Sequence, residues 1–194
     1  MKNLVFILSL IASIGFSQAS FAQIAMVANA ETVANAEIVA NAEIVENKTI
    51  VDVALANKDF STLVAALKAA DLVEALQGEG PFTVFAPSND AFAKIDAETL
   101  SSLLEEKNKK ALATILTYHV IPGKLVARDV AAALKEGNGS IELKTLNGQL
   151  ITIMTTNGKI WLKDQDNNYS KLIATDVMAS NGVIHVVNAV AMPN

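Results

Sequence analysis

The chain has 194 residues, of which 52% are hydrophobic, a formal net charge of −5, two histidines and no cysteine. Without disulfides, the fold must be held by burial of apolar side chains. The acidic balance argues against nucleic acid as a partner. Catalytic zinc sites usually need three protein ligands, most often histidine or cysteine. With two histidines and no cysteine in the chain, we expect no metal and no cofactor.

Residues 1–22 have the features of a secretory signal peptide. Lys2 supplies the positive start, and an uncharged apolar run follows from Leu4 to Phe16. Ser20 and Ala22 are the small residues expected before a cleavage site. The apolar run is too short to span a bilayer comfortably. We therefore predict cleavage after Ala22 and no membrane insertion of the mature chain, which would be secreted to the periplasm, cell surface or medium.

Residues 23–48 contain a six-residue repeat, V-A-N-A-E-[T/I], in three copies from Val27 with a worn fourth copy from Val45. A period of six matches neither 3.6 nor 3.5, so an apolar stripe would drift around a helix. So few units are also too short for a β-helix core. We predict a flexible or partly helical tether, with a self-association or surface-contact segment as the alternative. The folded domain is predicted at residues 49–194.

The first half of this domain has helical spacing. Residues 49–76 repeat apolar positions at three and four residues. A short strand is predicted at 82–85, and Ser88 is a good N-cap for a short helix after it. Further helix is predicted up to Leu104 and again over 109–116.

The second half of the domain changes to a period of two, which indicates strands. A meander is predicted over 141–163, with Asn147-Gly148 and Asn157-Gly158 as type I′ turns. Residues 164–168 should form a loop, and two further strands should flank Asn181-Gly182. Helices followed by mostly antiparallel strands indicate an α+β fold.

Three ordered blocks resemble the motifs of the fasciclin domain family: FTVFAPSNDAF from Phe82, LTYHVIPG from Leu116 and SNGVIHVVNAVAMP from Ser180. The resemblance covers about residues 49–193. It implies a single β-wedge or sandwich of mostly antiparallel strands, with helices packed around it. One departure is Asn188, where the family more often carries aspartate, and this puts any acid-dependent contact there in doubt.

The resemblance also implies a function and a set of motif residues. The family is one of extracellular adhesion and matrix proteins, with secreted or surface-bound bacterial members, and enzymatic activity is not typical of it. The residues carried over as structural motif positions are Phe82, Thr83, Phe85, Pro87, Ser88, Asn89, Phe92, Pro122, Gly123, Gly182, His185 and Pro193.

Tyr118 and His119 are the first candidate site. If they lie in a strand, they point to opposite faces. We favour a structural His119 that is hydrogen-bonded at the edge of the core. In animal members of the family the Tyr-His pair is linked to integrin recognition, so Tyr118, His119, Leu116 and Ile121 are tentative partner-binding residues. No catalytic residue is assigned, because no G-x-S-x-G elbow or other nucleophile motif is present.

Three other features have a structural and a functional interpretation. His185 lies between valines and should be half-buried; a two-histidine metal site with His119 is the weaker alternative. Asp164–Asn168 resembles the start of a calcium loop, but Tyr169 and Thr175 stand where glycine and glutamate are needed, so a solvated turn is favoured. Trp161 is interpreted as a core-edge residue, with a sugar-stacking platform as the alternative.

Together these features predict a secreted or surface-exposed, non-enzymatic binding module for cell adhesion, extracellular matrix or biofilm, or host association. The alternative is a carbohydrate- or small-ligand-binding periplasmic module, and an enzyme is the third hypothesis. The partner is expected to be a protein or polysaccharide that the sequence does not identify, and the protein is expected to be a monomer.

Overall fold

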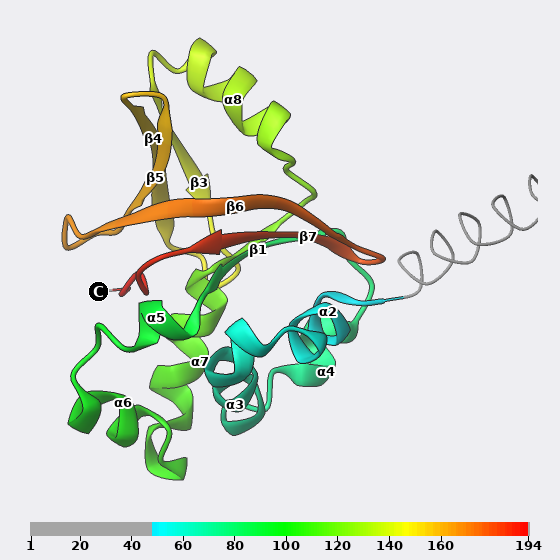
Figure 1. Ribbon diagram of the computed structural model, residues 1–194, viewed down its shortest axis with the longest axis vertical. Helices are drawn as coiled ribbons and strands as arrows, with labels where there is room; N and C mark the ends of the chain where they lie inside the picture. The colour runs from blue at the N-terminus through cyan, green and yellow to red at the C-terminus, as the bar shows by residue number, and fades with distance from the viewer. Residues whose placement is uncertain (1–47, 194) are drawn as a thin grey trace, which may run out of the picture. The chain divides into compact units, whose positions relative to one another are not determined.

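The computed structural model describes residues 48–193 (Figure 1). The predicted signal peptide and nearly all of the predicted tether lie outside these residues. Among the helices of residues 48–193, none is both long enough and apolar enough to cross a membrane.

The described chain alternates short helices with strands. In chain order the elements are α2 (Ile50–Ala56), η1 (Lys58–Phe60), α3 (Ser61–Ala69), α4 (Val73–Gln77), β1 (Phe82–Pro87), α5 (Asn89–Phe92), α6 (Ala97–Leu103), η2 (Glu106–Asn108), α7 (Lys109–Tyr118), β2 (Val120–Pro122), α8 (Ala127–Glu136), β3 (Ser140–Lys144), β4 (Leu150–Thr156), β5 (Lys159–Lys163), β6 (Tyr169–Ala179) and β7 (Gly182–Val187).

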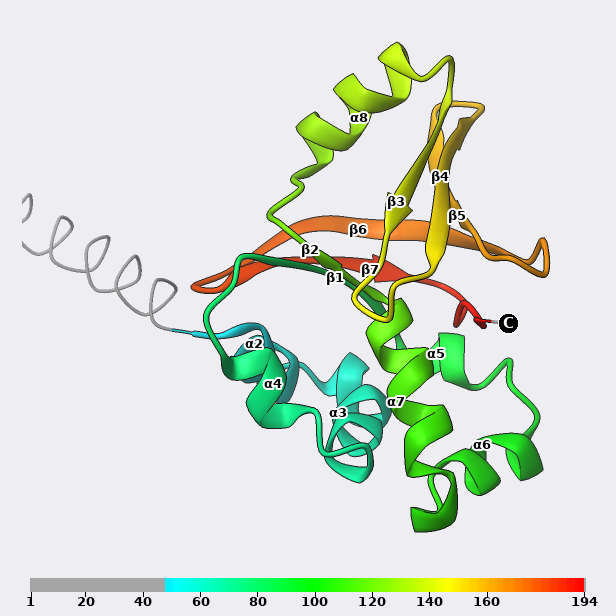
Figure 2. The same cartoon turned by 180° about the vertical axis from the view of Figure 1, so that it is seen from behind.

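The strands form one seven-stranded sheet in the order β2-β1-β7-β6-β5-β4-β3. Every neighbouring pair is antiparallel except β1 and β7, which run parallel from Phe82↔Gly182 to Pro87↔Val187. Figures 1 and 2 show α2 to α7 on one side of β1 and β7, and α8 with β3 to β5 on the other. The predicted α+β class with helices packed around mostly antiparallel strands is therefore confirmed.

The domain has two apolar cores. The first lies between the early helices and strands β1 and β7, and includes Phe60, Leu67, Leu116 and Ile184. The second lies under α8, which places Val130 and Leu134 against the inward residues of β4 and β5, namely Ile151, Ile153 and Leu162. The Tyr-His segment joins the two cores, because Leu116 belongs to the first and Tyr118 to the second.

Side-chain caps explain where several helices begin. Thr49 and Asp52 form a capping box at the start of α2, and Ser88 caps α5 as predicted, with its Oγ accepting from the backbone N–H of Ala91. The predicted helical stretch over 49–76 is divided into four pieces. One interruption is at Asn57, which caps η1, and another is at Asp71, which has a φ of 60°.

The predicted meander is confirmed as β3, β4 and β5, but its two turns differ. Asn157 and Gly158 have φ values of 53° and 70°, as a type I′ turn requires. At the other turn only Gly148 is left-handed, with a φ of 89°, and its N–H donates to the carbonyl of Thr145 at 2.9 Å. The type I′ prediction for Asn147-Gly148 was therefore wrong. Asn147 Oδ1 instead accepts from Thr145 Oγ1 and from Gln149 N.

Candidate functional site

Tyr118 and His119 were expected in a strand, but they lie at the end of a helix. Helix α7 buries Leu112 and Leu116 and continues to Tyr118, while His119 caps its C-terminus with φ −84° and ψ 0°. Only from Val120 does the chain become extended. The strand prediction for the pair was wrong, because the helix continues through Tyr118, but the two side chains still face different cores: Tyr118 lies in the second core and His119 lines a cavity in the first.

His119 is buried, with 3% of its surface exposed, and both ring nitrogens have partners. Nδ1 lies 2.8 Å from the carbonyl oxygen of Ile115, and the backbone N–H of Ala191 donates to Nε2 at 3.0 Å. A carbonyl can only accept, so Nδ1 carries the proton. Burial lowers the pKa of His119 below its usual value, so the neutral ring persists. The imidazole thus fastens the end of α7 to the C-terminal segment.

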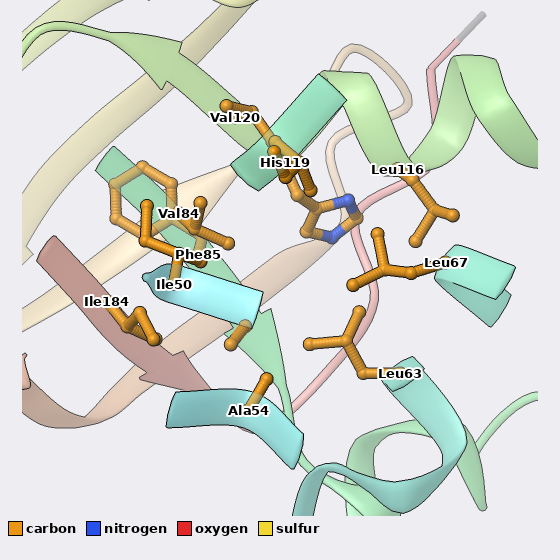
Figure 3. Close-up of a pocket in the computed structure, with 12 residues that line it drawn as sticks. Ile50, Ala54, Leu63, Leu67, Val84, Phe85, Leu116, His119, Val120 and Ile184 are labelled. Carbon is orange, nitrogen blue, oxygen red and sulfur yellow. The ribbon is translucent and has the colours of Figure 1, made fainter. Parts of the chain in front are cut away.

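The imidazole edge of His119 also faces the first core. Figure 3 shows the ring among apolar side chains that include Leu67, Leu116 and Val84. Together they enclose a cavity of about 20 Å³. A cavity of this size and lining is no ligand pocket, because drug-sized ligands need several hundred cubic ångströms.

The other three residues of the tentative contact surface are buried as well. Tyr118 is 0% exposed, and its hydroxyl donates to the carbonyl of Leu150 at 3.0 Å. Burial, with a further contribution from Asp164, raises the pKa of Tyr118 to about 12. Leu116 and Ile121 belong to the two cores. This burial favours the structural interpretation of the Tyr-His segment over a contact surface.

His185 has the same kind of environment, and it is fully rather than half buried. Its Nε2 donates to the carbonyl of Leu125 at 2.8 Å, and the N–H of Asp176 donates to Nδ1 at 3.3 Å. The ring of Phe85 lies against it, with centroids 5.6 Å apart. Across residues 48–193 no three His, Cys, Asp or Glu side chains come close enough to hold a metal ion.

The first motif joins β1 to its neighbours. Thr83 Oγ1 donates to the carbonyl of Gly123 at 2.6 Å and accepts from the N–H of Leu125 at 2.9 Å. Gly123 has a φ of +103°, which favours glycine after Pro122. Asn89 accepts from the N–H of Thr62 and donates to the carbonyl of Lys58. The remaining motif residues Phe82, Phe85, Pro87 and Phe92 belong to β1 and α5.

The closing motif connects the C-terminal strand to the first helices. Asn181 accepts from the N–H of Ile50 at 2.9 Å and donates to the carbonyl of Leu76 at 2.8 Å. A Cβ at Gly182 would collide with the carbonyl of Phe82, which explains why glycine stands there. This role of Asn181 was not predicted, because its place in an Asn-Gly turn accounts for the residue without any distant contact.

Asn188, the departure from the family pattern, accepts from the N–H of Lys171 through Oδ1 at 2.8 Å. An aspartate oxygen at this position could accept the same hydrogen bond. Pro193, the last motif residue, follows Met192 at the end of the described chain.

The solvated turn expected over Asp164–Asn168 is confirmed for residues 165–168, which are exposed, but it was wrong for Asp164. Its side chain is 4% exposed and accepts from the N–H and the side-chain amide of Asn168, at 2.8 and 3.1 Å. The N–H of Met192 also donates to it, at 3.1 Å. Asp164 therefore holds its own loop and the C-terminal segment beside His119. The sequence did not indicate this structural role of Asp164, because the residues around it resemble the start of a calcium loop.

Trp161 is half-buried but belongs to neither core, so the core-edge interpretation was wrong. Its neighbours on β5, Ile160 and Leu162, turn inward to the second core, so Trp161 points to the opposite face of the sheet. A separate surface groove of about 350 Å³ lies between α5 and the second half of β6, where Ile173 and Val177 meet Asp59 and Asp90.

The seven-stranded sheet and the burial of most motif residues define the class of this domain, and comparison with known proteins identifies its family. A family model of the fasciclin domain matches residues 58–193. The chain belongs to the fasciclin domain family.

Relatives come from bacteria and animals. Protein sll1483 of Synechocystis is 51% identical over 143 residues, which cover 74% of this chain and 72% of that protein. Pig transforming growth factor-beta-induced protein ig-h3 is 37% identical over 74% of this chain, but the match covers 19% of ig-h3. Human periostin is 36% identical over 71% of this chain and 15% of its own length. The chain therefore corresponds to a small part of each animal protein.

A solved structure supports the fold. The FAS1 domain pair from the insect cell adhesion molecule fasciclin I superposes with a TM-score of 0.64 at 18% identity. The match covers 73% of this chain and 50% of the pair.

Proposed function

We propose that this protein is a non-enzymatic binding module, secreted or exposed at the cell surface, that acts in adhesion to a matrix, a biofilm or a host. Its family membership supports this, because a matching structure comes from an insect cell adhesion molecule. The predicted signal peptide supports the location.

The observation that carries the proposal is the use of both histidines for internal hydrogen bonds. A general base needs a ring nitrogen that can reach the substrate. In His119 and His185, all ring nitrogens already pair with backbone groups, and both rings are buried. Tyr118 is also buried, and its raised pKa keeps the hydroxyl protonated at neutral pH, so the side chain does not serve as a base. We therefore assign these groups to the stability of the fold and the adhesive contact to exposed side chains.

The test is an adhesion assay with the protein that begins at Gln23. Beads coated with it should bind matrix or cells, and exhaustive chelation of divalent ions should leave the number of bound beads unchanged. Failure to bind any protein, polysaccharide or cell surface would contradict the adhesion proposal. Adhesion that chelation removes and calcium restores would contradict a metal-independent contact and reopen a role for Asp164 and Asp166.

The location is tested separately. Fractionation of the producing cells should recover the protein outside the cytoplasm, with Gln23 as its first residue. A cytoplasmic protein that keeps Met1 would contradict the proposed secretion.

A further inference from the structure

The outer face of strands β3 to β6 gathers aromatic and basic side chains. In the strand register, Trp161 on β5 lies beside Met154 on β4 and Lys171 on β6. Lys159 and Lys163 share its face, because side chains two residues apart on a strand point the same way. Three lysines therefore surround one half-buried indole.

Further residues extend this surface. Lys163 is paired with Tyr169, which is 52% exposed, and Lys144 lies on the same face at the end of β3. We call this surface the Lys-Trp face, formed by Trp161, Tyr169, Lys144, Lys159, Lys163 and Lys171. The α8 helix does not cover it, because α8 packs on the inward side chains of the same strands. The outer residues of this sheet are exposed or half-buried, and a partner can reach them.

The charge of the Lys-Trp face is opposite to that of the whole chain. Three of its lysines lie on β3 and β5, where the outer positions of β3 to β5 carry one acidic residue, Glu142, and the fourth lysine lies on β6, whereas the chain has a net charge of −5. None of these lysines forms an ion pair with any of residues 48–193, where the bridges involve Lys107, Lys109 and Arg128. The ammonium groups are therefore available to an anionic partner.

We propose that the Lys-Trp face binds an acidic polysaccharide, a chain of sugars that carry uronate carboxylates. This inference rests on the proposed adhesive function and identifies the class of its partner. An indole offers a flat apolar surface for a sugar ring, and the flanking ammoniums pair with carboxylates. Lys159 and Lys163 lie about 13 Å apart along β5, since a strand rises about 3.3 Å per residue. The face is long enough to contact more than one sugar of an extended polymer.

The geometry favours a polysaccharide over a membrane. Insertion into a bilayer needs apolar side chains that protrude from the surface. Trp161 instead lies in the middle of a strand, with neighbours on both sides in the sheet. A flat ring enclosed by charges suits stacking on an extended chain better than insertion.

The test uses the chain from Gln23 and measures its retardation in native gels that contain polygalacturonate or alginate. Neutral dextran, anionic phospholipid vesicles and single-stranded DNA are the comparison probes. We expect both polyuronates to retard the protein and dextran to have no effect. Because two charged contacts are reversed, Lys163→Glu with Lys171→Glu should weaken binding to polyuronate by about tenfold or more.

Two further variants make the test specific. Lys68→Glu with Lys110→Glu reverses the same number of charges at exposed positions on α3 and α7, and should bind polyuronate like the unchanged protein. Trp161→Ala should weaken retention, while Trp161→Phe, which keeps an aromatic ring and guards against a folding defect, should retain most of it.

Other results would overturn the proposal. Equal losses in the control and the face variants would mean that net charge alone acts. Tighter binding to vesicles or DNA than to polyuronate would assign the face to another partner. If beads coated with the Lys163→Glu, Lys171→Glu variant adhere to matrix as well as the unchanged protein, the Lys-Trp face is refuted while the adhesive function stands.

Discussion

Replacing His119 by alanine removes the side chain that ties α7 to the C-terminal segment. In the variant, the N–H of Ala191 loses its acceptor and the carbonyl of Ile115 loses its side-chain donor. An unsatisfied buried polar group costs about 1–3 kcal/mol. The missing ring also leaves a void beside an existing cavity of about 20 Å³, and this adds to the loss. We therefore expect a destabilisation of about 2–4 kcal/mol.

Urea unfolding measures this loss directly. The midpoint should fall while the slope with denaturant stays the same, as expected when stability alone changes. Two comparisons sharpen the result. His119→Gln, which offers the N–H of Ala191 a new acceptor, should recover part of the stability. Lys110→Ala, on the exposed side of α7, should stay within about 0.5 kcal/mol of the unchanged protein.

A small effect on stability would mean that His119 does not hold these two segments together. If His119→Ala also stayed within about 0.5 kcal/mol, the histidine would behave as a surface residue. The internal tie between Ile115, His119 and Ala191 would then be wrong, and partner recognition by the Tyr-His segment would regain support.

Three other predictions follow from the same contacts. Burial lowers the pKa of His119, so the stability that the neutral ring contributes is complete above about pH 6.5 and is lost as the pH falls below that value. The Tm of the protein should therefore decrease between pH 7.5 and pH 5, and the Tm of His119→Gln should decrease less. Asp164→Asn places an amide N–H₂ group near the N–H of Met192 and should cost about 1–3 kcal/mol in urea unfolding, whereas a loss below 0.5 would mean that the loop is solvated after all. A chain that begins at Asn47 should have a Tm within about 4 °C of the chain that begins at Gln23, and a larger decrease would show that the repeat packs on the domain. A chain that begins at Lys58 should melt at a much lower temperature, because it lacks α2 and its buried residues.

Much of the fold could be predicted because its signals are local. Alternation of apolar residues predicts β3, β4 and β5, and Ser88 has the right side chain and position to cap α5. The Asn157-Gly158 turn also follows from its two residues. The parallel pairing of β1 with β7 is different, because it joins residues about a hundred positions apart and no local pattern encodes it.

The candidate site was harder to predict, because burial depends on contacts between distant segments. Asp164 was expected to be solvated because its neighbours in the sequence are polar. In the structure it is buried, and it accepts hydrogen bonds from the N–H of Met192 and the side-chain amide of Asn168. The end of α7 was misplaced because a β-like apolar run continues directly from the helix. Asn181 has no local sign that it will accept from Ile50.

The Lys-Trp face was indicated only in part by the sequence, which offered Trp161 as a sugar-stacking platform in the alternative but gave no role to the lysines. Lys159, Lys163 and Lys171 lie on two strands of a protein of acidic composition, so net charge conceals them. Strand pairing brings them around Trp161. The burial of Ile160 and Leu162 in the second core then shows that the tryptophan faces away from it.

The central claim is that the Tyr-His segment supports the fold while an exposed surface performs adhesion. Its most direct test is adhesion per folded molecule, measured together with urea unfolding on the same preparation of His119→Gln. We predict a loss of stability with unchanged adhesion of the molecules that remain folded. Unchanged stability with lost adhesion would contradict the account and make Tyr118 and His119 the binding site.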